Sequence, residues 1–162
     1  MESTRAFLLR NLDHAFEGPA WHGPALLGAI RRVTPEEAAW RPAPDRHCIW
    51  DLVLHAAYWK YAVRRRLAGT KRGGFARKGS NFFPLPEPAD AAALRADVAL
   101  LHEEHAQLRA AVAEMSESSF ERKAAGSKWS NETMIQGVAF HDIYHAGQIQ
   151  LLKRLQAGVV AE

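Results

Sequence analysis

Apolar residues recur along most of this chain at intervals of three and four, which is the spacing of an amphipathic helix. Four stretches carry such a face: residues 3–16, about 47–67, about 90–115 and about 130–156. A shorter helix is predicted after the first stretch, from Gly23 to Val33, with a proline in its first turn. We predict no strand, so the chain is expected to form an all-α fold.

Glycine, proline and capping residues mark the ends of these helices. Gly18 ends the first helix, Gly69 ends the second long one, and Asp90 caps the third. The motif TPEE at residues 34–37 predicts a capped short turn of helix. Residues 69–89 contain four glycines and three prolines. They therefore form a long connection, of a length that is typical of a functional loop or a crossover.

The last two long helices each carry an apolar seam with steps of four and three residues, as in helix bundles. The seam of the third helix consists of Leu94, Val98, Leu101, His105, Leu108, Val112 and Met115. The seam of the fourth consists of Met134, Val138, His141, His145, Gln148, Leu152 and Leu155. Three successive positions of the fourth seam are therefore polar. Because an unpaired buried polar group costs about 1–3 kcal/mol, these three residues need a common explanation.

A metal ion is one explanation for the polar seam. His141 and His145 are four residues apart, so both rings leave the same face of the helix. His55 lies in the apolar stripe of the second long helix and can supply a third ligand from a facing element. Neutral imidazoles bind zinc, nickel, copper and iron(II), and three of them leave positions open, as in catalytic sites. Spacing alone leaves the alternative open that these are hydrogen-bonded core histidines.

Three further polar residues are positioned to support such a site. If the third and fourth helices are antiparallel neighbours, His105 lies level with His141 and is expected to be an outer partner of the ligands or part of the pocket wall. Gln148 lies one turn beyond His145 and can hydrogen-bond water at the ion. Asp51 lies one turn before His55 and either orients that ring or is simply a first-turn charge of its helix.

Composition places the chain among ordinary globular domains. It has 162 residues, of which 48% are hydrophobic and 24% charged, and we expect one domain over residues 1–162. The single cysteine, Cys48, excludes an intrachain disulfide and suits a reducing, cytoplasmic location. Residues 1–16 have no long apolar run, so we expect neither a signal peptide nor a membrane span there.

The charges are unevenly distributed. No acidic residue occurs between Asp51 and Glu87, a segment that contains eight lysines and arginines, most of them from Arg64 to Lys78. This basic segment is either a solvated connection or a site that attracts an anion, such as a carboxylate-rich thiol cofactor or a phosphate. No helix-turn-helix, zinc-finger or aromatic stacking motif accompanies it, so nucleic acid is not the expected partner.

Several segments resemble the DinB/YfiT-like superfamily of metal-dependent proteins. They are HCIWDLVLHAAYW at residues 47–59, GTKRGGFARKGSNFF at 69–83, WSNETM at 129–134 and AFHDIYHAGQIQLLKRL at 139–155. The resemblance implies a four-helix bundle of the up-down-down-up type. It further implies a long connection between the second and third long helices and an extra short helix after the first. By motif position, it also implies that His55, His141 and His145 bind one divalent transition metal, usually nickel or zinc.

The resemblance leaves the reaction open. Some members of the family look like transferases of low-molecular-weight thiols, others are called hydrolases, and family members often pair as homodimers. We therefore expect either a metal-dependent hydrolase or a thiol S-transferase that acts on a small molecule. The alternative is a non-catalytic bundle that binds a metal and a ligand, which the absence of a seam carboxylate favours because hydrolysis commonly uses a general base.

Overall fold

The computed structural model describes residues 2–124 and 126–159, and helices are the only regular secondary-structure elements within them. Two isolated β-bridges, Ser80 with Phe82 and Lys123 with Ser130, are the only extended pairings in this part of the chain. The helices are α1 (Thr4–Phe16), α2 (Leu26–Ile30), α3 (Pro35–Ala39), α4 (Ile49–Leu67), α5 (Ala91–Glu114), the 3₁₀ helix η1 (Glu117–Ser119) and α6 (Asn131–Val159). The prediction of an all-α fold is confirmed.

The short helix that follows α1 is shorter than the sequence predicts. We expected it to run from Gly23 to Val33, but only the five residues of α2 are helical. Arg31 already has an extended backbone, and Arg32 has a φ of 62°, in the left-handed region. A helix cannot continue through these conformations, and the chain restarts at Thr34, whose capping box opens α3.

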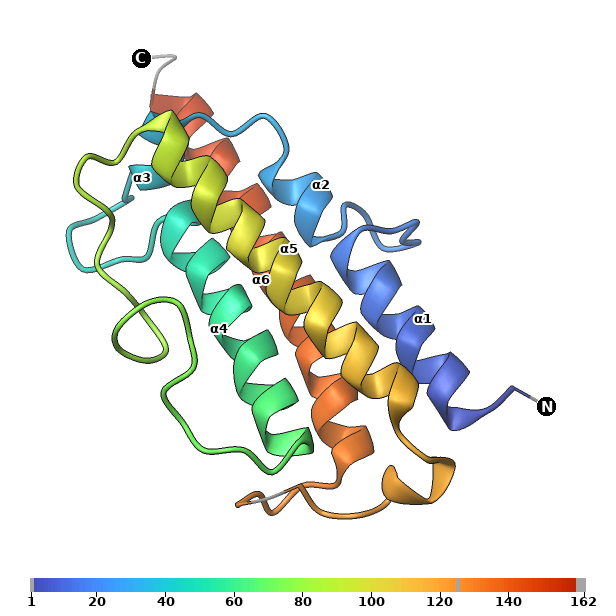
Figure 1. Ribbon diagram of the computed structural model, residues 1–162. Coiled ribbons are helices and arrows are strands. Elements are labelled where there is room, and N and C mark those ends of the chain that lie inside the picture. The colour runs from blue at the N-terminus through green and yellow to red at the C-terminus, as the bar shows by residue number, and fades with distance from the viewer. Residues whose placement is uncertain (1, 125, 160–162) are drawn as a thin grey trace.

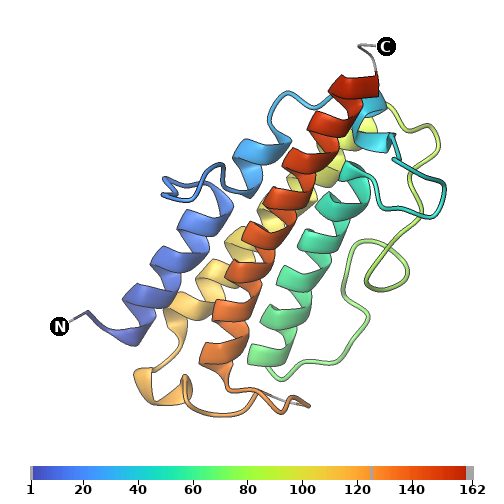
Figure 2. The same cartoon turned by 180° about the vertical axis from the view of Figure 1, so that it is seen from behind.

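The four long helices lie side by side, with α1 and α6 running one way and α4 and α5 the other way (Figure 1). α4 packs against both α5 and α6, and α1 packs against the same two helices. From behind, α6 lies between α1 and α4, with α5 on the far side (Figure 2). α5 and α6 are therefore diagonal to each other rather than neighbours. None of the helices in the described residues combines the length and hydropathy that crossing a membrane requires.

The core consists of apolar residues from all four long helices and includes ion pairs. Leu8, Leu108 and Ile135 are fully buried toward one end, and Leu26 and Ile149 toward the other. Between these clusters, Lys60 of α4 donates a hydrogen bond to Asp142 of α6, and both side chains are 0% exposed. Removing one partner of such a pair leaves an uncompensated charge in the core and is therefore strongly destabilising.

The start of α4 is fixed by a reciprocal hydrogen-bond pair. The Cys48 backbone N–H donates to the Asp51 carboxylate at 3.0 Å, and the Asp51 N–H donates to the Cys48 sulfur at 3.5 Å. The guanidinium of Arg41 donates to the same carboxylate. These contacts set the beginning of the helix and therefore place His55 one turn further along it.

The connection between α4 and α5 runs back along α4, because those two helices point in the same direction (Figure 1). The Gly74 N–H donates to the Tyr61 hydroxyl at 2.9 Å, and Arg77 forms an ion pair with the buried Asp97 of α5. Phe75 and Phe83 pack their rings around Tyr58 of α4. The connection is thus anchored to both helices and passes beside the histidines.

Candidate metal centre

Three histidine rings converge between α4 and α6. His55 comes from α4, and His141 and His145 come from α6. The Nε2 atom of His141 lies 3.0 Å from Nε2 of His55 and 2.9 Å from Nε2 of His145. One ring nitrogen from each of the three residues lies within 4.8 Å of the others. The structure thus brings together the three residues that the sequence singled out.

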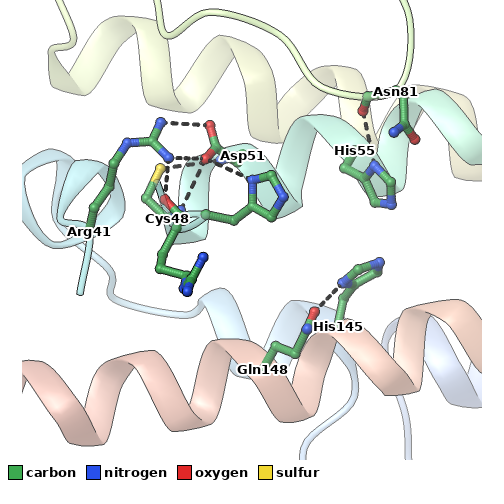
Figure 3. A network of polar contacts seen from close by, with 9 residues as sticks. Arg41, Cys48, Asp51, His55, Asn81, His145 and Gln148 are labelled. Carbon is green, nitrogen blue, oxygen red and sulfur yellow. Dashed lines mark hydrogen bonds and ion pairs between the residues drawn. The ribbon is translucent and has the colours of Figure 1, made fainter. Parts of the chain in front are cut away.

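Two hydrogen bonds orient the rings from behind. Nδ1 of His55 lies 2.9 Å from the backbone oxygen of Asn81, and Nδ1 of His145 lies 2.6 Å from Oε1 of Gln148 (Figure 3). Both oxygens only accept hydrogen bonds, so each Nδ1 carries the ring proton and donates it. The Nε2 atoms of His55 and His145 therefore carry lone pairs, and both point toward His141.

Burial keeps these imidazoles neutral. Desolvation, with a smaller contribution from the neighbouring histidines, lowers the pKa of His141 to about 3. Desolvation also lowers the pKa of His145 to about 4, although its hydrogen bond to Gln148 opposes the shift. The pKa of His55 is lowered for the same reason. At neutral pH all three rings are therefore uncharged, the form in which histidine binds a metal.

The convergence of three neutral imidazoles fits a cation. A single N–H on Nε2 of His141 can serve only one of the two lone pairs that face it, so a proton alone leaves one acceptor without a partner. A positive ion satisfies all three nitrogens at once. Ligand nitrogens at 2.0–2.1 Å from a metal, with angles of roughly 90–109°, lie roughly 2.9–3.4 Å apart. Two of the three observed spacings, 2.9 and 3.0 Å, fall in that range, and the His55–His145 pair lies within 4.8 Å.

Among the residues predicted to support the site, Gln148 contacts one of the three histidine rings and Asp51 does not. Gln148 bonds directly to His145, and its amide nitrogen donates to the Tyr144 hydroxyl at 3.3 Å. The hydrogen bonds of the Asp51 carboxylate go instead to Arg41 and the Cys48 backbone. Of the two roles considered for Asp51, these contacts match that of a first-turn residue, and the Asn81 carbonyl is what lies behind Nδ1 of His55.

His105 lies elsewhere in the core. Its ring stacks on Phe16 of α1 with centroids 3.8 Å apart, and neither ring nitrogen has a hydrogen-bond partner in the described residues. No hydrogen bond or ring contact joins it to His55, His141 or His145. We placed it level with His141 on the assumption that α5 and α6 are neighbours, and the diagonal arrangement of these helices removes that basis.

Sequence reasoning missed the segment that closes the site from the α4–α5 connection. Asn81 has a φ of 68°, a left-handed conformation that asparagine tolerates better than most residues. Its side-chain oxygen accepts a hydrogen bond from the Trp59 indole at 3.0 Å, and Phe82 stacks on His55 at 4.3 Å. The sequence signals were the position of this Asn-Phe pair in the long connection and its place near the end of residues 69–83, which resemble the DinB/YfiT-like superfamily.

The fold and the cluster together define the class: this is a helical protein whose three converging, neutral histidines are compatible with metal binding. The family model of the DinB superfamily matches residues 20–149 of the chain, a span that includes all three histidines. The chain belongs to this superfamily. Comparison with curated proteins and with solved structures found no match.

Proposed function

We propose that this protein binds one divalent transition metal ion per chain, nickel or zinc, through the Nε2 atoms of His55, His141 and His145. One observation carries the proposal: the outer hydrogen bonds of His55 and His145 leave two lone pairs that point at a third imidazole. Membership of the DinB superfamily supports it, because that superfamily is metal-associated.

The proposed activity is transfer of a low-molecular-weight thiol to a small electrophilic molecule, or hydrolysis of such a molecule. When bound, the ion supplies Lewis-acid chemistry and helps a thiol or water lose its proton near neutral pH. The chain contributes the positioning: Asn81 and Gln148 hold two of the rings from behind. The rings of Trp59 and Phe82 cover His55 and limit access of solvent to it.

A non-catalytic metal- and ligand-binding bundle is the second candidate. It is favoured by the absence of a general base, since no carboxylate in the described residues belongs to the histidine cluster. The buried carboxylates nearby are already paired, Asp142 with Lys60 and Glu104 with Arg64. Turnover of candidate thiol and ester substrates by the metal-loaded protein, compared with binding alone, distinguishes the two candidates.

We also propose the family's up-down-down-up four-helix bundle, with the α4–α5 connection as its crossover, and a homodimer as the assembled form. The helix directions in Figure 1 support the bundle. The dimer is supported by an exposed apolar strip on α6, here called the α6 strip, which consists of Phe140, Tyr144, Leu151 and Leu155. Residues with these intervals lie on one side of a helix.

The metal proposal is tested by the metal content of freshly purified protein. We expect about one nickel or zinc per chain, and its loss when His141 and His145 are both replaced by alanine, because one imidazole cannot hold the ion tightly. The matched control is His22→Ala, which removes an exposed histidine. Full metal retention in the double variant contradicts the assignment, as does wild-type protein that neither contains nor takes up either metal.

A further inference from the structure

A cavity of about 400 Å³ opens between α4 and α6 directly beside the histidines. Its lining residues are Trp59, Val63, Arg66, Trp129, Thr133, Met134, Gly137, Val138 and His141. The volume is that of a small-molecule site. His141 stands at one end, where the Trp59 ring meets it edge-on with centroids 6.2 Å apart.

The walls of this cavity are almost entirely apolar. Two tryptophans, two valines and a methionine supply most of its lining. Gly137 leaves room in the α6 wall, since a Cβ atom built there meets nothing within 4 Å. Apart from the indoles, the only uncharged polar side chains in the lining are the Thr133 hydroxyl and the His141 imidazole. A polyhydroxylated sugar or a nucleotide would therefore leave many polar groups without partners, which opposes its binding.

Arg66 is the only permanently charged residue that lines the cavity. The other two arginines of the same helical turn are engaged, Arg64 with Glu104 and Arg65 with the Thr70 carbonyl. Within residues 2–124 and 126–159, the Arg66 side chain has neither a hydrogen-bond nor an ion-pair partner, although it is half-buried. No carboxylate lines the cavity, so an anion there meets a free guanidinium and no repelling charge.

The distance between the two polar ends sets the length of a ligand. Trp59, beside His141, and Arg66 are seven residues apart on α4. At 1.5 Å per residue this separation is roughly 10 Å along the helix axis. An extended molecule with one aromatic ring and a short chain spans that distance.

We propose that this cavity binds small molecules with an apolar body and a single anionic group, with the anion on Arg66 and the other end at His141. The cavity proposal adds a ligand class to the proposed function. It rests on the proposed function only for the chemistry at the His141 end. The basic segment thus contributes one specific anion-binding residue, whereas Arg64 and Arg65 serve the fold.

The test uses three probes with the same body: 4-phenylbutyrate, 4-phenylbutan-1-ol and 4-phenylbutylamine. Each is titrated by calorimetry into nickel-loaded and metal-free protein. We expect the anion to bind about tenfold more tightly than the alcohol in both forms, and the amine to bind most weakly, as expected for one charged hydrogen bond. In Arg66→Gln the anion and the alcohol should bind equally, and Arg66→Lys should restore part of the difference.

A second variant tests whether the cavity itself is the site. Gly137→Leu fills the free space in the α6 wall and should weaken binding of both the acid and the alcohol at least tenfold. Gly158→Leu is the matched control, because this α6 glycine is equally unobstructed and lies outside the cavity. If Gly137→Leu does not fold, the probe series on Arg66→Gln still decides the proposal.

Different results separate this proposal from the metal assignment. Equal binding of the three probes to wild-type protein overturns it, as does unchanged binding in a folded Gly137→Leu variant. An anion preference that survives Arg66→Gln but disappears with the metal also overturns it, because the histidine site would then bind the anion. Conversely, a chain that holds no metal yet shows the expected probe order contradicts the proposed function and supports the cavity.

Discussion

His105 is a polar residue held in the core without a hydrogen bond. It is 6% exposed, it stacks on Phe16, and neither ring nitrogen has a hydrogen-bond partner in the described residues, although Nε2 lies 3.9 Å from a carboxylate oxygen of Asp13. Desolvation and, to a lesser extent, the nearby Lys60 ammonium lower its pKa to about 3. The same ring that the sequence placed near an ion is therefore best understood as a neutral, flat packing residue.

This environment predicts how stability depends on pH. In the unfolded chain the pKa of His105 is about 6.5. Below that pH the unfolded state therefore binds a proton that the native state does not. The stability of the native state is therefore lost as pH falls, by about 1.4 kcal/mol per pH unit for this one group, until its native pKa is reached. We expect His105→Leu to show a shallower loss in urea unfolding of metal-free protein between pH 6.5 and 5.

At pH 7 the leucine variant should be at least as stable as the wild type, since it removes two unpaired buried nitrogens. Metal titration compares this variant with one at a residue that does contact the histidine cluster. His105→Leu should keep its affinity, whereas Gln148→Leu removes the partner of His145 Nδ1 and should weaken metal affinity about 10- to 100-fold. Identical pH slopes in wild type and His105→Leu, or a comparable metal loss in both variants, would refute this description of His105.

At the scale of the element, the beginning of α4 depends on Asp51. Its carboxylate accepts hydrogen bonds from the Cys48 N–H and from Arg41 while only 4% exposed. Asp51→Ala should lower the free energy of unfolding by about 1–3 kcal/mol, because a helix cap and a charged hydrogen bond are lost together.

Chemical denaturation measures that loss, and metal titration should show an unchanged affinity in the Asp51 variant. Asp45→Ala is the control, because Asp45 is exposed and, in the part of the chain that the structure describes, pairs only with its neighbour Arg46. A metal affinity that falls in Asp51→Ala while stability is kept would instead assign this carboxylate to the histidine site.

Helix by helix, the sequence was sufficient where local spacing decides the structure. The apolar intervals predicted α1, α4, α5 and α6 within a few residues, because burial of one face is a local pattern. The same intervals do not determine which helices are neighbours. Whether His105 lies near His141 depends on which helices are neighbours. The direction in which the α4–α5 connection returns decides this.

The histidine cluster could be predicted only in part for a related reason. The spacing of His141 and His145 identifies them as candidate ligands, and the place of His55 in an apolar stripe identifies it as a third. The partner of His55, however, is a backbone oxygen, which every residue possesses, so no side-chain type marks Asn81 in advance. Likewise, Arg66 differs from Arg64 and Arg65 in having no partner among the described residues, a property of the folded protein.

At the scale of the whole molecule, the α6 strip predicts self-association. Tyr144 and Leu151 are 63% and 59% exposed, which is unusual for large apolar side chains clustered along one helix face. Light scattering at tens of micromolar should give twice the chain mass, and Leu151→Glu should shift the protein to monomer because two like charges would meet across a two-fold interface. The control is Phe7→Glu, a half-exposed apolar residue on α1. A monomeric wild type rules out the dimer.

The cluster joins residues that are far apart in the sequence, since 86 positions separate His55 from His141. During synthesis at about 5–20 residues per second, the two α6 histidines follow the α4 histidine by roughly 4–17 s. Throughout that interval the nascent chain has only one of the three clustered imidazoles, that of His55. If the proposed ion needs all three ligands, it enters only after α6 has been made and has docked on α4, and truncated chains would then not compete with finished ones for scarce metal.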